Sequence, residues 1–152
     1  MPQMIDWKSE IDSRRKKLWE IIQRNKFDLG LVYSSGEHPQ NFRYITNFVP
    51  TMGEMWAVIS GEQQMDCVLT FHWELEQARI QSGIDGWYGA FELLPVVKER
   101  IEVHLPHRIA VIGMERIPAR AYGNLVERFP DVSFVDVEDE YTRLRRKKEE
   151  RT

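Results

Sequence analysis

Few side chains in this sequence have the types and spacing that metal binding or catalysis requires. The four histidines, His38, His72, His104 and His107, are scattered along the chain. A metal site needs several His, Cys or carboxylate ligands that converge on one point. The closest pair, His104 and His107, has a proline between its members and no cysteine pair nearby. We therefore expect no metal and no cofactor to be bound by this chain, and we identify no catalytic residue in it.

An acidic cluster near the C-terminus, Asp136, Glu138, Asp139 and Glu140, is a second candidate site. Such carboxylates could bind a divalent cation, but they are also typical of the first turn of a helix, where acids cap free N–H groups and complement the helix dipole. We favour helix capping. The sequence also lacks a G-x-S-x-G elbow, a Walker loop and a G-x-G-x-x-G turn, so hydrolase, phosphate-loop and dinucleotide sites lack their local signals.

The single cysteine, Cys67, lies in the apolar run Met65–Leu69. We interpret it as a buried, inert thiol and not as a nucleophile, because reactive cysteines lie in electropositive, partly exposed surroundings. One cysteine excludes an internal disulfide and is typical of a reducing compartment.

Length and composition indicate one globular domain that spans residues 1–152, with 42% hydrophobic residues and a formal charge of −3. Basic and acidic residues are nearly balanced, so we expect no nucleic-acid partner. No apolar run approaches the ~18 residues of a membrane span, and the N-terminus lacks the pattern of a signal peptide. We expect a cytoplasmic protein with no membrane contact.

The first half of the chain predicts a helix, a strand, a short helical turn and a hairpin. The helix covers residues 6–24, with Trp7, Ile11, Leu18 and Ile22 on one face and Arg14 or Arg15 in the gap between them. A buried strand at 29–33 leads to a turn that opens at Pro39 and ends at Asn47, in which Tyr44 and Phe48 can pack together. The runs 55–60 and 64–70 are joined by a short Gly-containing link and must pair antiparallel.

The second half predicts alternating helices and strands. Thr70 is expected to cap a helix that stops at Gly83, and a short strand at 84–88 follows. We then expect a helix at 94–104, a strand at 108–112 and a helix from Pro118 whose apolar face is Tyr122, Leu125, Val126 and Phe129. A strand at 132–137 precedes a final helix capped by Asp136. An antiparallel pair beside strand–helix units predicts an α/β fold, a three-layer α/β/α sandwich with a mixed sheet.

Five short motifs follow one another along the chain: Phe27–Val32, Asn41–Phe48, Glu74–Ala78, Ile109–Glu115 and Tyr141–Lys148. Their order resembles that in the N-terminal domain of the creatinase, prolidase and Xaa-Pro aminopeptidase family. Phe27–Val32 is similar to that family's "lDalLv" strand, and Asn41–Phe48 to its "N-x-x-Y-L-[ST]-G-F" turn, with Asn47 in place of the glycine. Glu74–Ala78 resembles the "E-x-E-x-A" helix, Ile109–Glu115 the "iGvE" strand, and Tyr141–Lys148 the "lR-x-iK" segment. The motifs follow the family's order over nearly the whole chain.

The resemblance implies a ribonuclease-H-like architecture and a non-catalytic role. Catalysis in that family belongs to a C-terminal "pita-bread" domain with two divalent metals (Mn, Co or Zn), and residues 139–152 would begin the helix that leads into it. We expect a chain that forms homodimers and shapes the active-site entrance of an Xaa-Pro dipeptidase or aminopeptidase. It also implies a structural ion pair for Arg14 and a structural turn made by Asn41, Tyr44, Thr46 and Phe48.

Two alternatives stay open: a stand-alone binding or scaffold domain of the same fold, and a small α/β enzyme with an unrecognised site. Fold alone assigns no activity.

The loop 49–54 is the one segment for which the resemblance implies contact with substrate. In creatinases the matching loop reaches the neighbouring subunit's active site with an aromatic residue, a glycine and an arginine. Met52, Gly53 and Glu54 occupy those places here. A cation thus becomes an anion, which would repel a substrate carboxylate. We therefore expect the full-length protein not to be a creatinase.

The lack of a convergent ligand set predicts that this chain binds no divalent metal tightly and hydrolyses no Xaa-Pro peptide. Calorimetric titration of the chain with manganese and with zinc checks it. A stoichiometric site of micromolar affinity would show that ligands were overlooked.

Overall fold

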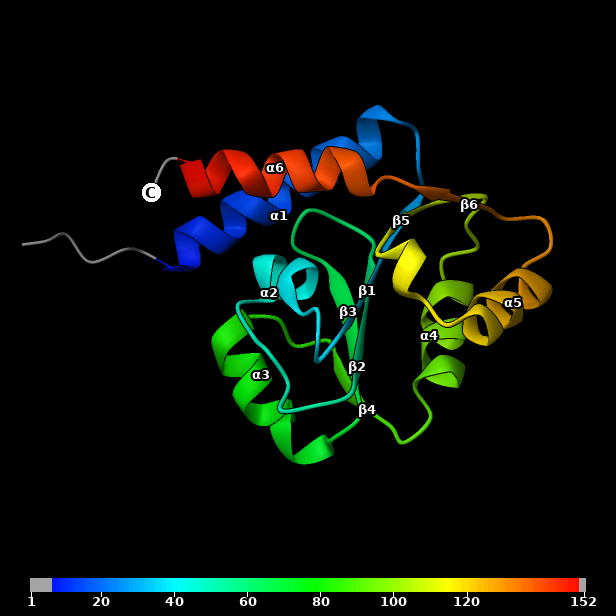
Figure 1. The fold of residues 1–152 in the computed structure, drawn as a ribbon, viewed down its shortest axis with the longest axis horizontal. Helices are drawn as coiled ribbons and strands as arrows, with labels where there is room; N and C mark the ends of the chain where they lie inside the picture. Colours follow the sequence, from blue (N-terminus) through cyan, green and yellow to red (C-terminus); the bar gives the residue numbers. More distant parts are fainter. Residues whose placement is uncertain (1–6, 151–152) are drawn as a thin grey trace, which may run out of the picture.

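Residues 7–150 are described in the computed structural model, and they form a six-stranded mixed sheet between helices (Figure 1). The strand order is β4-β3-β2-β1-β5-β6. The strands are β1 (Leu29–Ser35), β2 (Glu54–Ile59), β3 (Met65–Leu69), β4 (Trp87–Gly89), β5 (Arg108–Ile112) and β6 (Ser133–Asp136). Residue 6 of the expected first helix and residues 151–152 of the expected connecting helix lie outside the described residues.

Six α-helices and two short 3-10 helices accompany the sheet in residues 7–150. They are α1 (Trp7–Arg24), α2 (Gln40–Thr46), η1 (His72–Glu74), α3 (Leu75–Ser82), α4 (Leu93–Glu102), η2 (Met114–Arg116), α5 (Ala119–Arg128) and α6 (Glu138–Glu150). None of these combines the length and the apolar content that crossing a membrane requires.

Strand β1 is the centre of the sheet. It pairs antiparallel with β2 and parallel with β5. Because successive side chains of a strand point to opposite faces, Val32 packs with α1, α2, α3 and α6 on one face, whereas Leu31 and Tyr33 pack with α4 and α5 on the other. Both faces are therefore covered, and the predicted α/β/α sandwich with a mixed sheet is confirmed.

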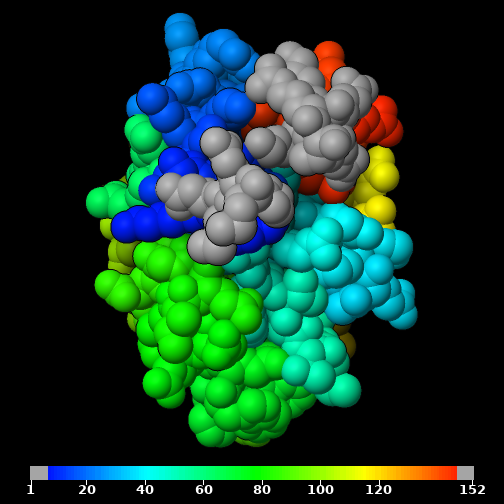
Figure 2. Space-filling view, turned by 90° about the vertical axis from the view of Figure 1, so that its left-hand side faces the viewer, coloured from blue at the N-terminus to red at the C-terminus, as the bar shows by residue number. Residues whose placement is uncertain are grey.

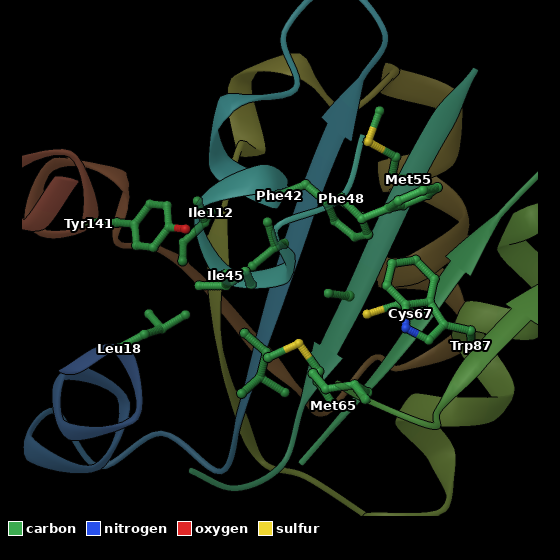
Figure 3. Packing of buried hydrophobic residues seen from close by; sticks show 14 of the residues in the cluster. Leu18, Phe42, Ile45, Phe48, Met55, Met65, Cys67, Trp87, Ile112 and Tyr141 are labelled. Atoms are coloured by element: carbon green, nitrogen blue, oxygen red, sulfur yellow. The ribbon is translucent and has the colours of Figure 1, made fainter. Parts of the chain in front are cut away.

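The face under the four helices holds a continuous core (Figure 3). Leu18 of α1, Phe42 and Ile45 of α2, and Tyr141 of α6 are all at most 1% exposed within it. The sheet supplies the other wall, which includes Cys67. Burial raises the pKa of the Cys67 thiol, which agrees with the prediction of an inert cysteine.

The predictions for Trp7, Thr70 and Val126 are wrong. Trp7 is 52% exposed, because the buried face of α1 starts one turn later, at Ile11. Thr70 caps no helix, since α3 is preceded by η1, whose N-cap residue is Phe71 and has no side-chain cap. Val126 is 41% exposed, because α5 buries only Leu125 fully.

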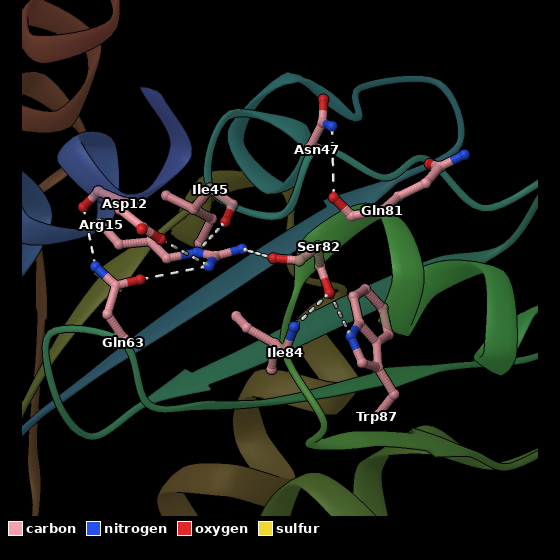
Figure 4. Close-up of polar contacts among 9 residues, drawn as sticks. All are labelled: Asp12, Arg15, Ile45, Asn47, Gln63, Gln81, Ser82, Ile84 and Trp87. Carbon is pink, nitrogen blue, oxygen red and sulfur yellow. Dashed lines mark hydrogen bonds and ion pairs between the residues drawn. The ribbon is translucent and has the colours of Figure 1, made fainter. Parts of the chain in front are cut away.

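Arg15, not Arg14, fills the gap in the apolar face of α1, and it is 4% exposed (Figure 4). Its Nε donates to the Ile45 carbonyl at 2.7 Å and its Nη2 to the Ser82 carbonyl at 2.6 Å. Its Nη1 reaches Gln63 Oε1 at 3.4 Å, and the nearest carboxylate, Asp12, is 3.9 Å away. Arg14 instead makes the expected ion pair, with Glu10 at 3.1 Å.

The two carbonyls that bind Arg15 belong to the last turns of α2 and α3. Helix C-termini carry about half a negative charge each and leave carbonyls without intrahelical partners. Burial lowers the pKa of Arg15, with Cys67 and Asp12 opposing that shift, but a guanidinium remains protonated in proteins. One buried cation thus serves two helix ends and ties α1 to both.

Replacing Arg15 by methionine should destabilise the fold by about 2–4 kcal/mol, because buried carbonyls lose their donors while the apolar volume is kept. Arg15→Lys should lose less stability than Arg15→Met, because its ammonium can still donate to some of these acceptors but cannot reach all of them at once. Urea unfolding of the chain measures both. The matched control Lys16→Met, at an exposed site on the same helix, should change stability by less than about 0.5 kcal/mol. An Arg15→Met effect as small as the control's would contradict the structural role.

Candidate functional site

The turn after β1 is closed by one threonine and one residue in the left-handed conformation. Asn47 has φ 58° and donates its N–H to the Arg43 carbonyl at 2.8 Å, which ends α2. The fully buried Thr46 hydroxyl donates to the Phe42 carbonyl at 2.8 Å and accepts the Phe48 N–H at 3.2 Å. Asparagine tolerates this backbone conformation, so the predicted end of the turn is confirmed.

Asn41, the first residue of the turn motif, connects α2 to α6. Its Nδ2 donates to Glu138 Oε1 at 3.0 Å, and the buried Tyr141 hydroxyl donates to its carbonyl at 2.6 Å. The other oxygen of Glu138 accepts the Gly113 N–H at 2.8 Å. The same carboxylate therefore fixes the turn, the end of β5 and the first residue of α6.

Tyr44 and Phe48, which we expected to pack together, lie against different partners. The Tyr44 ring is 5.7 Å from that of Tyr141 and 4.6 Å from the guanidinium carbon of Arg14. Phe48 is 5.5 Å from Trp87, edge to face. Tyr44 therefore packs against α6, and Phe48 packs against β4.

The loop 49–53 follows this turn and is fastened at Gly53. Gly53 has φ 93°, and a Cβ there would lie 2.9 Å from Thr70 Oγ1. Its carbonyl accepts the Gly36 N–H at 2.9 Å. A glycine is required for two reasons. Residues with a side chain rarely adopt this positive φ, and a Cβ at this position would clash with Thr70. Met52, directly before it, is 56% exposed.

Glu54 is the first residue of β2, on the face of the sheet that carries Tyr33 and Trp56. The buried Tyr33 hydroxyl donates to Glu54 Oε1 at 3.1 Å, and the Tyr33 ring lies 4.7 Å from that of Trp56. Burial, together with the Glu54 carboxylate, raises the pKa of Tyr33. Glu54 is half-buried, so it is held in place and is not a freely moving surface charge.

A second contact of the loop was not foreseen from the sequence. The N–H of Thr51 donates to Glu74 Oε1 at 2.9 Å, and the Thr51 hydroxyl donates to the same oxygen. Glu74 belongs to the "E-x-E-x-A" motif, which was the only signal that the sequence offered. The pairing itself depends on the register of the hairpin, in which Met55 lies opposite Leu69.

The turn and the loop together present a surface. Among the side chains that the structure describes, those of residues 7–146, no group of three or more His, Cys, Asp or Glu is placed to hold a metal ion. The site consists of an ordered loop that exposes Met52 beside a half-buried carboxylate, Glu54.

Comparison with solved structures shows the same fold in peptidase domains. The X-Pro aminopeptidase from Thermotoga maritima MSB8 matches with a TM-score of 0.72 and 17% identity, over 86% of this chain and 35% of that one. The Xaa-Pro dipeptidase from Bacillus anthracis matches with a TM-score of 0.63 and 18% identity, over 86% of this chain and 33% of that one. The N-terminal domain of cytoplasmic peptidase PepQ from Mycobacterium tuberculosis H37Rv matches with a TM-score of 0.66 and 17% identity, over 87% of this chain and 98% of that one.

This chain thus spans about a third of the longer peptidase chains and nearly all of the solved N-terminal domain. No curated protein sequence matches it. The model of the creatinase/prolidase N-terminal domain matches residues 14–147. That match covers all of β1 to β6 as well as the turn and the loop, and the chain therefore belongs to the creatinase/prolidase N-terminal domain family.

Proposed function

We propose that this chain is the non-catalytic N-terminal domain of a metal-dependent Xaa-Pro dipeptidase or aminopeptidase. In the full-length protein it would associate subunits and shape the entrance of the active site. The observation that carries the proposal is the family match together with an ordered, exposed loop where the resemblance implies contact with substrate. The hydrolytic chemistry and its two divalent metals would belong to the domain that follows.

Subunit association is supported by exposed apolar side chains in the segments that lie beside the loop. Trp73 is 65% and Phe91 88% exposed. The contacts that bring them near the loop are Thr51 with Glu74, and Gly89 with His72, whose Cα would lie 3.0 Å from an added Cβ. We call Met52, Trp73 and Phe91 the loop end. In Figure 2, the blue-green loop before β2 and the green surface of η1 and α3 lie at the bottom of the molecule. Exposed aromatic residues are enriched in interfaces between subunits.

We also infer a cytoplasmic protein. The support is one structural relative, which is described as a cytoplasmic peptidase, and the single buried cysteine.

The chain should self-associate at high micromolar concentration through the loop end, because burying exposed aromatic surface is favourable. Sedimentation equilibrium should show dimers, and Trp73→Ser should shift them toward monomer. Val103→Ser, at a similarly exposed site directly after α4, is the matched control and should leave the distribution unchanged. A strictly monomeric chain would contradict association through this domain alone.

In the full-length protein, Glu54→Arg should change the preference among cationic, neutral and anionic substrates, because it reverses the charge at the entrance. Glu54→Gln separates charge from hydrogen bonding, since its amide oxygen can still accept from Tyr33. The kcat/KM ratios across the substrate series measure the effect, with circular dichroism and metal content as controls. If these ratios stay within about twofold of those of the unsubstituted enzyme, ~0.4 kcal/mol, the loop does not contribute to substrate discrimination.

A further inference from the structure

Glu74 lies beside the loop 49–53, which we call the entrance loop after its proposed role, because the β2–β3 hairpin brings the two segments to the same end of the sheet. Met55 of β2 pairs with Leu69 of β3, so the residues before β2 and those after β3 leave the sheet side by side. Phe71 is extended, and the 3-10 turn η1 then places the side chain of Glu74 against the loop. This contact spans 23 positions of sequence.

The carboxylate of Glu74 acts as a fixed anchor. Both Thr51 donors, the backbone N–H and the hydroxyl, converge on Oε1, and hydrogen bonds to an ionised acceptor are roughly twice as strong as neutral ones. The second oxygen, Oε2, is shielded from solvent and has no partner among the described residues. A surface glutamate that moved freely would keep both oxygens in water, so the burial of Oε2 indicates a carboxylate held in one orientation.

Two fastenings therefore flank Met52. On one side Thr51 is bound to Glu74, and on the other the Gly53 carbonyl is bound to the Gly36 N–H while its backbone lies against Thr70. The Met52 side chain is 56% exposed between them. A loop ordered in advance loses less conformational entropy when it closes on a partner or substrate.

We propose that Glu74 is a positioning residue: through Thr51 it holds Met52 at the active-site entrance, so that substrate discrimination by the full-length enzyme depends on Glu74. This inference rests on the proposed function, because it assumes that the loop contacts substrate. Glu74 itself does not touch the substrate. Its role is to hold the surface that does.

The anchor is tested first, by amide hydrogen exchange of the 152-residue chain. Glu74→Ala should raise the exchange rates of the Thr51 and Gly36 amides about tenfold, because local opening becomes easier when the carboxylate is lost. Glu76→Ala is the matched control, an exposed glutamate two residues further along the same motif, and should leave both rates unchanged. Rates within about twofold of the unsubstituted chain in Glu74→Ala would overturn the anchor.

Amides of the sheet, such as those of Val32 and Ala57, report whether the fold survives. If they also lose protection in Glu74→Ala, the test passes to Thr51→Val, which removes only the hydroxyl donor. This variant should raise exchange at position 51 and at Gly36 by about threefold, with the sheet amides protected. No change there would overturn the anchor as well.

Discrimination is tested next, by kinetics of the full-length enzyme. Glu74→Ala should change the ratio of kcat/KM between substrates with small and with bulky side chains by about fivefold or more, mainly through KM. Metal content and kcat on the best substrate should stay within about twofold, and Glu76→Ala should match the parent enzyme. If exchange rises while these ratios do not change, the anchor stands and the entrance role fails. If exchange does not rise, the positioning role fails whatever the kinetics.

Discussion

The buried guanidinium of Arg15 is the interaction on which the helical layer depends. It joins α1 to the last turns of α2 and α3, at 2.7 Å and 2.6 Å. Helices of seven and eight residues are too short to be stable alone in water. Each ends at a residue in the left-handed conformation, Asn47 or Gly83, where carbonyls need external donors. The cation on α1 supplies them, so three segments distant in sequence become one layer.

The position of the loop 49–53 follows from that layer and from the hairpin. With α2 held in place, Thr46 fixes the path of the chain into Phe48, and Asn41 connects the turn to Glu138 at the start of α6. The pairing of β2 with β3 brings Glu74 to Thr51. An exposed loop is thus supported from both the helical layer and the sheet, which is how rigid scaffolds present binding residues.

The elements could be predicted from the sequence because their signals are local. The β2–β3 hairpin, the strand β5 and the stop at Gly83 follow from apolar runs, period and glycine placement. The anchor of the loop could not be predicted, because the contact of Thr51 with Glu74 depends on strand register across 23 positions. The expected burial of Trp7 and Val126 was wrong for a related reason. The spacing of apolar residues identifies the apolar face of a helix, but it does not show how far the neighbouring layer extends over that face. The position of the loop at an active-site entrance comes from the family resemblance and stays a prediction.

The residues that hold the loop in place are not the residue that it exposes, and this difference has an evolutionary consequence. Thr51, Gly53, Thr70 and Glu74 hold the backbone, whereas the Met52 side chain is more than half exposed. An exchange of side chain at position 52 would therefore cost little stability, since surface substitutions away from fixed contacts are nearly neutral. Descendants of this domain could drift at that one position and acquire new surfaces while the scaffold beneath remained under constraint.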